Sequence, residues 1–416
     1  MSDHGASLAN LPIEGERVEV SKFSKIISAS AVVGGIGLAV SLGIFLIGGE
    51  MRESFAYSWL FACYYFFTIC VGGLFFVLLH NASNSGWGIA VRRVMEHLAN
   101  MLPYAFLLLI PILFLPTPRD ALYEWMALLG NGDAFLEAKA PYLTKGFFYL
   151  RILLYAISLC GIAYLLRKWS VGQDDTGDVK KTLLARRFSC GFIPIFAVAS
   201  TFMGVDLLMG LDYTWFSTMW GVYLFAGSAL SSMAVIILTV AALRNQGYLG
   251  RVVSIEHFHI MGKLMFAFIV FWAYISFSQF FLYWYAKVTE ETKFYILRNT
   301  EGWHFVSLFL VFGHFVVPFV FLLRQGAKKD LRQICAVAVW VLFVHMVDIY
   351  WIVIPERGPS LTGGVQLTIA GAVILDILAF LTVGGAMVWL FLRSLGKYSI
   401  YPARDPRLLE SARLVN

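Results

Sequence analysis

Long apolar segments alternate with short charged stretches along almost the whole chain. A transmembrane helix needs about 20 consecutive, predominantly apolar residues, and ten segments meet that requirement. The pattern therefore predicts an all-α polytopic membrane protein with ten transmembrane helices. The predicted spans are residues 26–49, 56–80, 97–116, 147–168, 188–212, 216–243, 262–286, 302–323, 332–354 and 364–392.

Composition supports the same fold class. Hydrophobic residues make up 59% of the 416-residue chain and charged residues 14%, whereas a soluble domain carries about 25% charged residues. Residues 1–25 are rich in charge and poor in apolar residues, so they lack the pattern of a signal peptide. We therefore expect a cytoplasmic tail at 1–25, a transmembrane domain at 26–393 and a second cytoplasmic tail at 394–416.

Basic residues are unevenly distributed between the two sides of the predicted membrane. The side that holds both termini carries 23 of the 32 Lys and Arg residues, and the other side carries 9. The positive-inside rule then places the N- and C-termini in the cytoplasm. Topology thus accounts for the net charge of +6, and nucleic-acid binding is excluded because the basic residues are scattered over separate short loops.

Redox cofactors and metals have no sequence signature here. The five cysteines form no C-x-x-C motif, which argues against covalent haem c and Cys-ligated Fe–S clusters. His304 and His314 are ten residues apart, which is about 15 Å along a helix, and they point to different faces of it. They therefore do not form a pair of ligands for haem b. We expect this chain to bind no metal or redox cofactor of its own.

Ionisable residues inside the predicted spans are the main functional signal. His345 and Asp348 are three residues apart, so they share one helix face, at a depth where a charged side chain costs about 2.5–3.5 kcal/mol or more. Several such residues on different spans suggest a proton pathway, and the candidates are Asp206, His314, His345, Asp348 and Asp376. The alternative places His345, Asp348 and Tyr350 at the edge of a quinol pocket. Glu96 and His97 lie near an interface, where we expect them to be solvated.

Several segments, taken in order, resemble a known family. They are 55–62 (FAYSWLFA), 86–93 (GWGIAVRR), 212–223 (DYTWFSTMWGVY), 256–268 (EHFHIMGKLMFAF), 345–355 (HMVDIYWIVIP) and 401–411 (YPARDPRLLES). Together they are similar to the NrfD/PsrC superfamily of quinone-interacting membrane subunits. Within it they are most similar to the ActF-type subunits of bacterial alternative complex III, a quinol:electron-acceptor oxidoreductase. The likeness extends from about residue 50 to the C-terminus.

The resemblance carries its own expectations. It implies two four-helix bundles, from spans 2–5 and 6–9, with two peripheral helices, in the bacterial cytoplasmic (inner) membrane. It implies a proton pathway coupled to the oxidation of a quinol such as menaquinol by partner subunits. Those partners are an NrfD-like ActC subunit, the Fe–S subunit ActB, multihaem cytochrome c subunits, small membrane subunits and a terminal oxidase.

Three other functions remain open at this point. In the first, the chain itself is the quinol-binding subunit, of the ActC type. In the second, it is a secondary transporter. In the third, it is a structural anchor whose polar residues only pack helices against one another. Transporters often have helices broken at mid-membrane, and Pro194 and Pro318 mark two places where such a break would occur. The absence of paired, Gly-interrupted helices argues against that class.

Overall fold

The computed structural model describes residues 15–47, 49, 51–300, 302–358 and 369–415. Within them, ten helical segments are long and apolar enough to cross a membrane, which confirms the predicted fold class. The segments are Val20–Leu46, Met51–Ala82, Arg92–Phe114, Lys145–Thr176, Val179–Leu211, Trp220–Asn245, Ile255–Ala286, Trp303–Leu323, Leu331–Arg357 and Gly371–Leu395. The predicted start of the last span, residue 364, lies outside the described residues.

Individual helices follow these segments closely. The spans are built from α2 (Ser24–Ile47), α3 (Met51–Ala82), α4 (Arg92–Ala99) with α5 (Leu102–Phe114), α9 (Lys145–Thr176), α10 (Val179–Leu207), α11 (Trp220–Asn245), α12 (Ile255–Ala286), α14 (Trp303–Leu310) with α15 (Val317–Leu323), α17 (Leu331–Val353) and α18 (Ile369–Leu395). Several are longer than the apolar runs that predicted them. A helix of 32 residues is about 48 Å long, so its ends project beyond a hydrocarbon core of about 30 Å.

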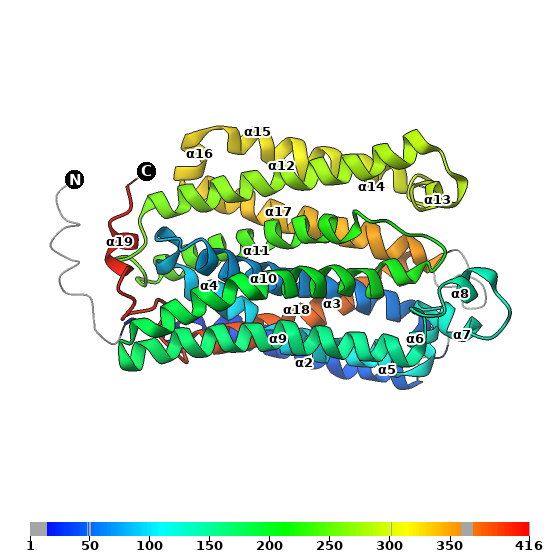
Figure 1. The fold of residues 1–416 in the computed structure, drawn as a ribbon, viewed down its shortest axis with the longest axis horizontal. Helices are drawn as coiled ribbons and strands as arrows, with labels where there is room; N and C mark the ends of the chain where they lie inside the picture. The colour runs from blue at the N-terminus through cyan, green and yellow to red at the C-terminus, as the bar shows by residue number, and fades with distance from the viewer. Residues whose placement is uncertain (1–14, 48, 50, 301, 359–368, 416) are drawn as a thin grey trace.

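Short helices cap both ends of the bundle (Figure 1). The end that carries the chain termini, called the terminal end below, holds α16 (Gln325–Lys329) and α19 (Leu408–Ala412). The opposite end, called the far end, holds α6 (Pro116–Leu122), α7 (Trp125–Leu128), α8 (Ala134–Ala138) and α13 (Thr289–Leu297). At the terminal end, Arg17 pairs with Ser399 in a single antiparallel bridge, so both tails are anchored together.

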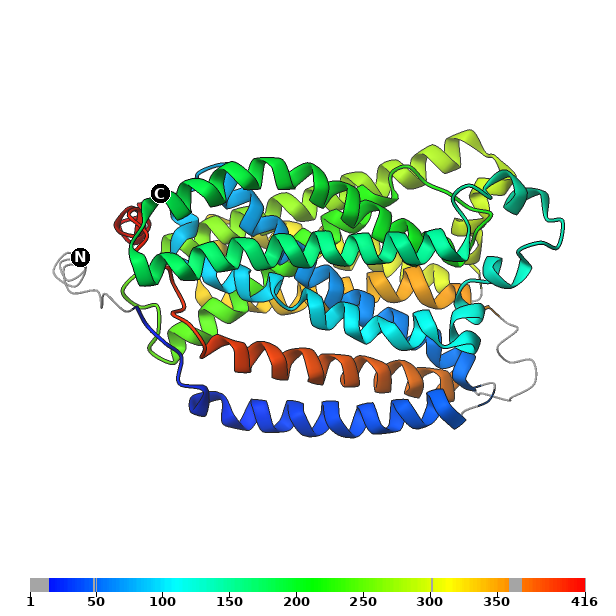
Figure 2. The same cartoon turned by 60° about the horizontal axis from the view of Figure 1, so that its bottom comes forward.

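Most of the membrane-spanning helices pack into two groups. Helices α3, α4, α5, α9 and α10 pack together as one bundle, and α11, α12, α14, α15 and α17 pack as the second. Helices α2 and α18 lie side by side along one flank (Figure 2). The two bundles are joined through α3 and α11, which contact each other along their length and are the most buried spans.

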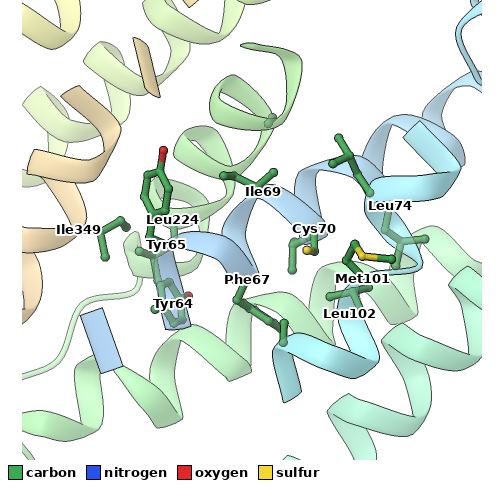
Figure 3. Packing of buried hydrophobic residues seen from close by; sticks show 14 of the residues in the cluster. Tyr64, Tyr65, Phe67, Ile69, Cys70, Leu74, Met101, Leu102, Leu224 and Ile349 are labelled. Atoms are coloured by element: carbon green, nitrogen blue, oxygen red, sulfur yellow. The ribbon is translucent and has the colours of Figure 1, made fainter. Parts of the chain in front are cut away.

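Helix α3 is central because it is apolar on every face. It has no Asp, Glu, Lys or Arg from Ser54 to its end, and a helix that is hydrophobic all round is buried against other helices. Its side chains meet Met101 and Leu102 of the third span, Leu224 of α11 and Ile349 of α17 (Figure 3). A Cβ on Gly72 would lie 2.0 Å from the Ser228 carbonyl oxygen, so only glycine allows α3 and α11 to approach this closely.

Candidate functional site: a buried histidine–aspartate centre

Three ionisable side chains meet in the core of the second bundle. They are His345 and Asp348 of α17 and His314 of the eighth span, and one ligand atom from each lies within 4.8 Å of the others. All three are at most 1% exposed. We call this group the His–Asp centre. The predicted shared face of His345 and Asp348 is confirmed, because His345 Nδ1 lies 4.0 Å from Asp348 Oδ2.

A local change of helix type places His314 in this centre. Residues Val311–Val316 form a π-helical segment between α14 and α15. Each N–H of a π-helix donates to the carbonyl five residues earlier, and proline lacks an N–H, so Pro318 leaves the Gly313 carbonyl without its helical donor. The Gly313 carbonyl instead accepts a hydrogen bond from Trp340 Nε1 at 2.7 Å. π-Helical turns inside α-helices are frequent at functional sites, and this one carries an imidazole into the core.

Asp348 is held by neutral donors. Its carboxylate accepts hydrogen bonds from the Tyr223 hydroxyl and from Trp272 Nε1, the latter at 3.2 Å. Among the described residues no Lys or Arg forms an ion pair with it. Burying a carboxylate without a fixed cation costs several kcal/mol. A buried carboxyl group without such a cation is neutralised by taking up a proton or by binding another cation.

The hydrogen bonds of Thr68 determine which nitrogen of His345 carries a proton. The Thr68 hydroxyl donates its only proton to the Tyr65 carbonyl at 2.6 Å. Its oxygen lies 3.0 Å from His345 Nε2 and must therefore accept from Nε2–H. In the neutral imidazole this leaves Nδ1 as a bare lone pair facing Asp348. Nδ1 has no hydrogen-bond partner in the structure, and neither ring nitrogen of His314 has one.

The centre borders a cavity of about 550 Å³ on the lipid-facing side of the second bundle. Tyr223 and Trp272, which hold Asp348, form part of its wall. Most of the remaining lining is apolar or aromatic, and His304, Ser307 and Asn299 add polar groups. Phe277 and Leu308 line the cavity and are also exposed on the outer surface. The cavity therefore offers a route from the bilayer to the wall of the centre.

Asp206 lies elsewhere, in the first bundle towards the far end of α10. Arg151 Nε and Nη2 donate to its two oxygens at 2.8 and 2.7 Å, and the hydroxyls of Tyr142 and Tyr155 add bonds of 3.0 and 2.8 Å. The carboxylate is buried and fully hydrogen-bonded, and a bidentate arginine neutralises its charge. A cavity of about 380 Å³ lined by Asp206 and Asp212 opens beside it.

Asp376 forms a third separate group. It accepts hydrogen bonds from Tyr350 at 2.8 Å, from Ser58 at 2.6 Å, and from Arg357. Tyr350 therefore points to Asp376, and it is not among the residues that line the 550 Å³ cavity. The five predicted pathway residues thus occupy three sites. Two of these sites have a buried arginine as counter-ion, and only the His–Asp centre does not.

Glu96 and His97 were expected to be solvated, and this expectation is wrong, since both are 2% exposed. Glu96 lies 3.4–3.5 Å from Arg92, Arg93 and Arg167, and Arg167 Nη2 lies 3.0 Å from His97 Nε2. Acidic residues from two other parts of the chain pair with these arginines, and Asp174 lies 2.7 Å from Arg93. Asp405 contributes by pairing with Arg92 at 2.9 Å.

A row of serines lies between the His–Asp centre and the polar group around Glu96. Ser228, Ser231 and Ser232 of α11 are buried on the terminal side of the His–Asp centre. The Ser232 hydroxyl has no hydrogen-bond partner. Serine hydroxyls both donate and accept, so this row adds polar groups on the helix that links the centre to the terminal end.

Asp212 is an ionised residue at the far end, outside the membrane spans. Burial raises its pKa, but Lys293 Nζ at 2.5 Å and the hydrogen bonds from Thr214 outweigh burial and hold the pKa below its ordinary value. Asp212 is therefore anionic at neutral pH. Its ion pair with Lys293 lies at the edge of the far-end cavity that Asp206 also lines.

The Asp206–Arg151 pair provides a stability test. Asp206→Leu should destabilise the protein by about 3–5 kcal/mol, because it leaves a buried guanidinium without its partner. The double variant Asp206→Leu/Arg151→Met should recover most of that loss, because both buried charges are then removed. Thermal unfolding of the purified chain in detergent measures both effects. A double variant no more stable than Asp206→Leu would contradict this description of the pair.

The sequence matches no protein-family model, and it matches no curated protein either. The functional argument therefore depends on the geometry of the His–Asp centre and on the segments that resemble the NrfD/PsrC superfamily. Of the residues that build the centre, Tyr223, Trp272 and Thr68 were not among the predicted site residues. They were overlooked because each reads as ordinary helix packing in the sequence.

Proposed function

We propose that this chain is a multi-pass membrane subunit that conducts protons within a quinol-oxidising respiratory complex. The observation that supports it most is the His–Asp centre, where a buried carboxylate and two imidazoles converge without a fixed cation. Intramembrane Asp and His residues of this kind are typical of proton relays. The partner subunits in this proposal are those of alternative complex III, as the sequence resemblance implies.

In this proposal the proton is held between His345 Nδ1 and Asp348 Oδ2. The 4.0 Å separation is too long for a direct hydrogen bond, so transfer uses a small rotation or one bridging water. Tyr223 joins the centre to the cavity, because its hydroxyl bonds Asp348 while its side chain lines the cavity wall. His314 provides a second acceptor with both nitrogens free of other partners.

The proposed route continues in both directions. On the terminal side it follows Ser228, Ser231 and Ser232 towards Glu96, which the positive-inside rule places near the cytoplasm. On the far side it reaches the groups around Asp376 and Asp206. Because each of these is paired with an arginine, we assign them to positioning and electrostatic roles, and we assign proton storage to the His–Asp centre alone.

A substitution at Asp348 tests the relay. In the reconstituted complex, Asp348→Asn should lower proton release per electron, because an amide has nearly the same size and shape as a carboxyl group but cannot take up a proton. Asp133→Asn is the matched control, since Asp133 caps α8 at the far end, outside the spans. Proton release by Asp348→Asn equal to that of the control, with assembly intact, would contradict the proposed relay.

The 550 Å³ cavity favours quinol binding by this chain as a second candidate function. Its volume falls within the range of ligand pockets, and pockets of that kind are mainly apolar with few polar groups. A quinol headgroup in the cavity would lie against Tyr223 and Trp272, one hydrogen bond from Asp348. Deprotonation of the quinol would then load the same centre directly.

Filling the cavity distinguishes the two functions. Ala273→Trp places an indole in the cavity, and Ala267→Trp places one on the exposed face of the same helix. If this chain binds quinol, photo-crosslinking of a quinone analogue to it should fall at least several-fold in Ala273→Trp and stay unchanged in Ala267→Trp. Crosslinking confined to a sister subunit would reject quinol binding here.

A further inference from the structure

The donor set of the His–Asp centre is that of a transition-metal site. Two imidazoles and one carboxylate are ligands that zinc and its first-row neighbours share. Magnesium and calcium, by contrast, prefer oxygen ligands alone. Here the three ligands come from two different helical segments, and His314 and His345 are far apart in the sequence. These ligands therefore form no metal-binding motif in the sequence. The prediction that the chain binds no metal was made without this combination of residues.

The orientation of His345 matches that of a metal ligand. A coordinating imidazole usually donates its other N–H to a fixed acceptor, which sets the ring orientation. Thr68 provides that acceptor for Nε2–H, and Nδ1 is left bare and directed into the centre. Asp348 is likewise supported from outside, by Tyr223 and Trp272.

His314 provides the strongest independent indication. Its side chain is fully buried, and neither of its ring nitrogens has a hydrogen-bond partner. A buried polar group without a hydrogen-bond partner destabilises the folded protein. Coordination would satisfy one nitrogen. Trp272 packs against this imidazole, with the two ring centroids 3.7 Å apart and the ring planes tilted by 42°.

The three ligand atoms lie somewhat farther apart than the ligand atoms around a bound ion. Ligands of a tetrahedral zinc ion with bonds of about 2.0–2.1 Å lie roughly 3.3 Å apart, whereas the atoms here lie within 4.8 Å. Small side-chain rotations cover the difference. Gly227 faces the centre, and a Cβ there would lie 2.9 Å from His345 Cε1, so glycine leaves the space that the imidazole occupies.

Charge and access also suit an ion. Neutral imidazoles and an ionised Asp348 give the centre a charge of −1, so a divalent ion with one bound hydroxide would bring the total to zero. The fourth coordination position would face Tyr223, whose side chain separates the centre from the 550 Å³ cavity. That cavity provides the entry path that a buried site requires.

We propose that His314, His345 and Asp348 bind one divalent transition-metal ion of the zinc class, in competition with protons. Metal binding requires bare imidazole nitrogens and an ionised carboxylate, so the same atoms cannot hold a metal and a transferable proton together. A bound ion would therefore inhibit proton transfer through the centre. The binding itself does not depend on the proposed respiratory function.

Cobalt(II) is the probe for the test, because its visible absorption reports the ligand geometry. The full chain, purified in detergent and freed of metal by a chelator, is titrated with Co²⁺ and then with Zn²⁺. We expect about one Co²⁺ per chain, displaced by Zn²⁺. His314→Gln and His345→Gln should each weaken binding by roughly ten-fold or more.

His304→Gln is the matched control, since His304 lines the cavity and lies outside the His–Asp centre. It should bind Co²⁺ like the unmodified chain. Thermal unfolding checks that each variant is folded, and Asp348→Asn replaces any histidine variant that is not. Absence of stoichiometric binding, or equal binding in the variants and the control, would overturn the metal site while leaving the proton relay to its own test.

Discussion

The structure depends on how buried charge is balanced inside an apolar bundle. At Asp206 and Asp376 the balance is permanent, because Arg151 and Arg357 form ion pairs within the protein. At Asp348 only neutral donors are present, from Tyr223 and Trp272. The first two carboxylates therefore stabilise fixed contacts between helices. In the proposed function the third takes a counter-charge that comes and goes, which is the property that a proton relay and a metal site have in common.

Close helix packing keeps this centre dry and defined. Gly72 lets α3 approach α11, and that contact brings Thr68 to His345. The π-helical turn before Pro318 directs His314 into the same place. The π-helical turn and the Thr68 contact also provide hydrogen-bond partners within the protein, which polar groups in a bilayer require. The uncompensated carboxylate is thus built in by the fold.

The fold was largely predictable, because span length and apolar composition alone determine which segments cross a bilayer. The facing of His345 and Asp348 was predictable too, since it follows from helical periodicity. Their partners were not. Trp272 lies in an aromatic run that reads as packing, and Tyr223 and Thr68 come from other helices. Arg357 follows the predicted span 332–354, and nothing in the sequence indicates that it pairs with Asp376. The burial of Glu96 depends on the C-terminal segment folding back. Contacts between spans distant in sequence carry no periodic signal.

The central claim is that the Asp348 carboxyl changes its protonation state during turnover. Infrared difference spectroscopy of the quinol-reduced minus oxidised complex measures this directly, because protonated and ionised carboxyl groups absorb at different frequencies. The account predicts a carboxyl C=O difference band that disappears in Asp348→Asn. The band should persist in Asp206→Asn, because the native Asp206 carboxylate is already neutralised by Arg151. A set of carboxyl bands unchanged by Asp348→Asn would contradict it.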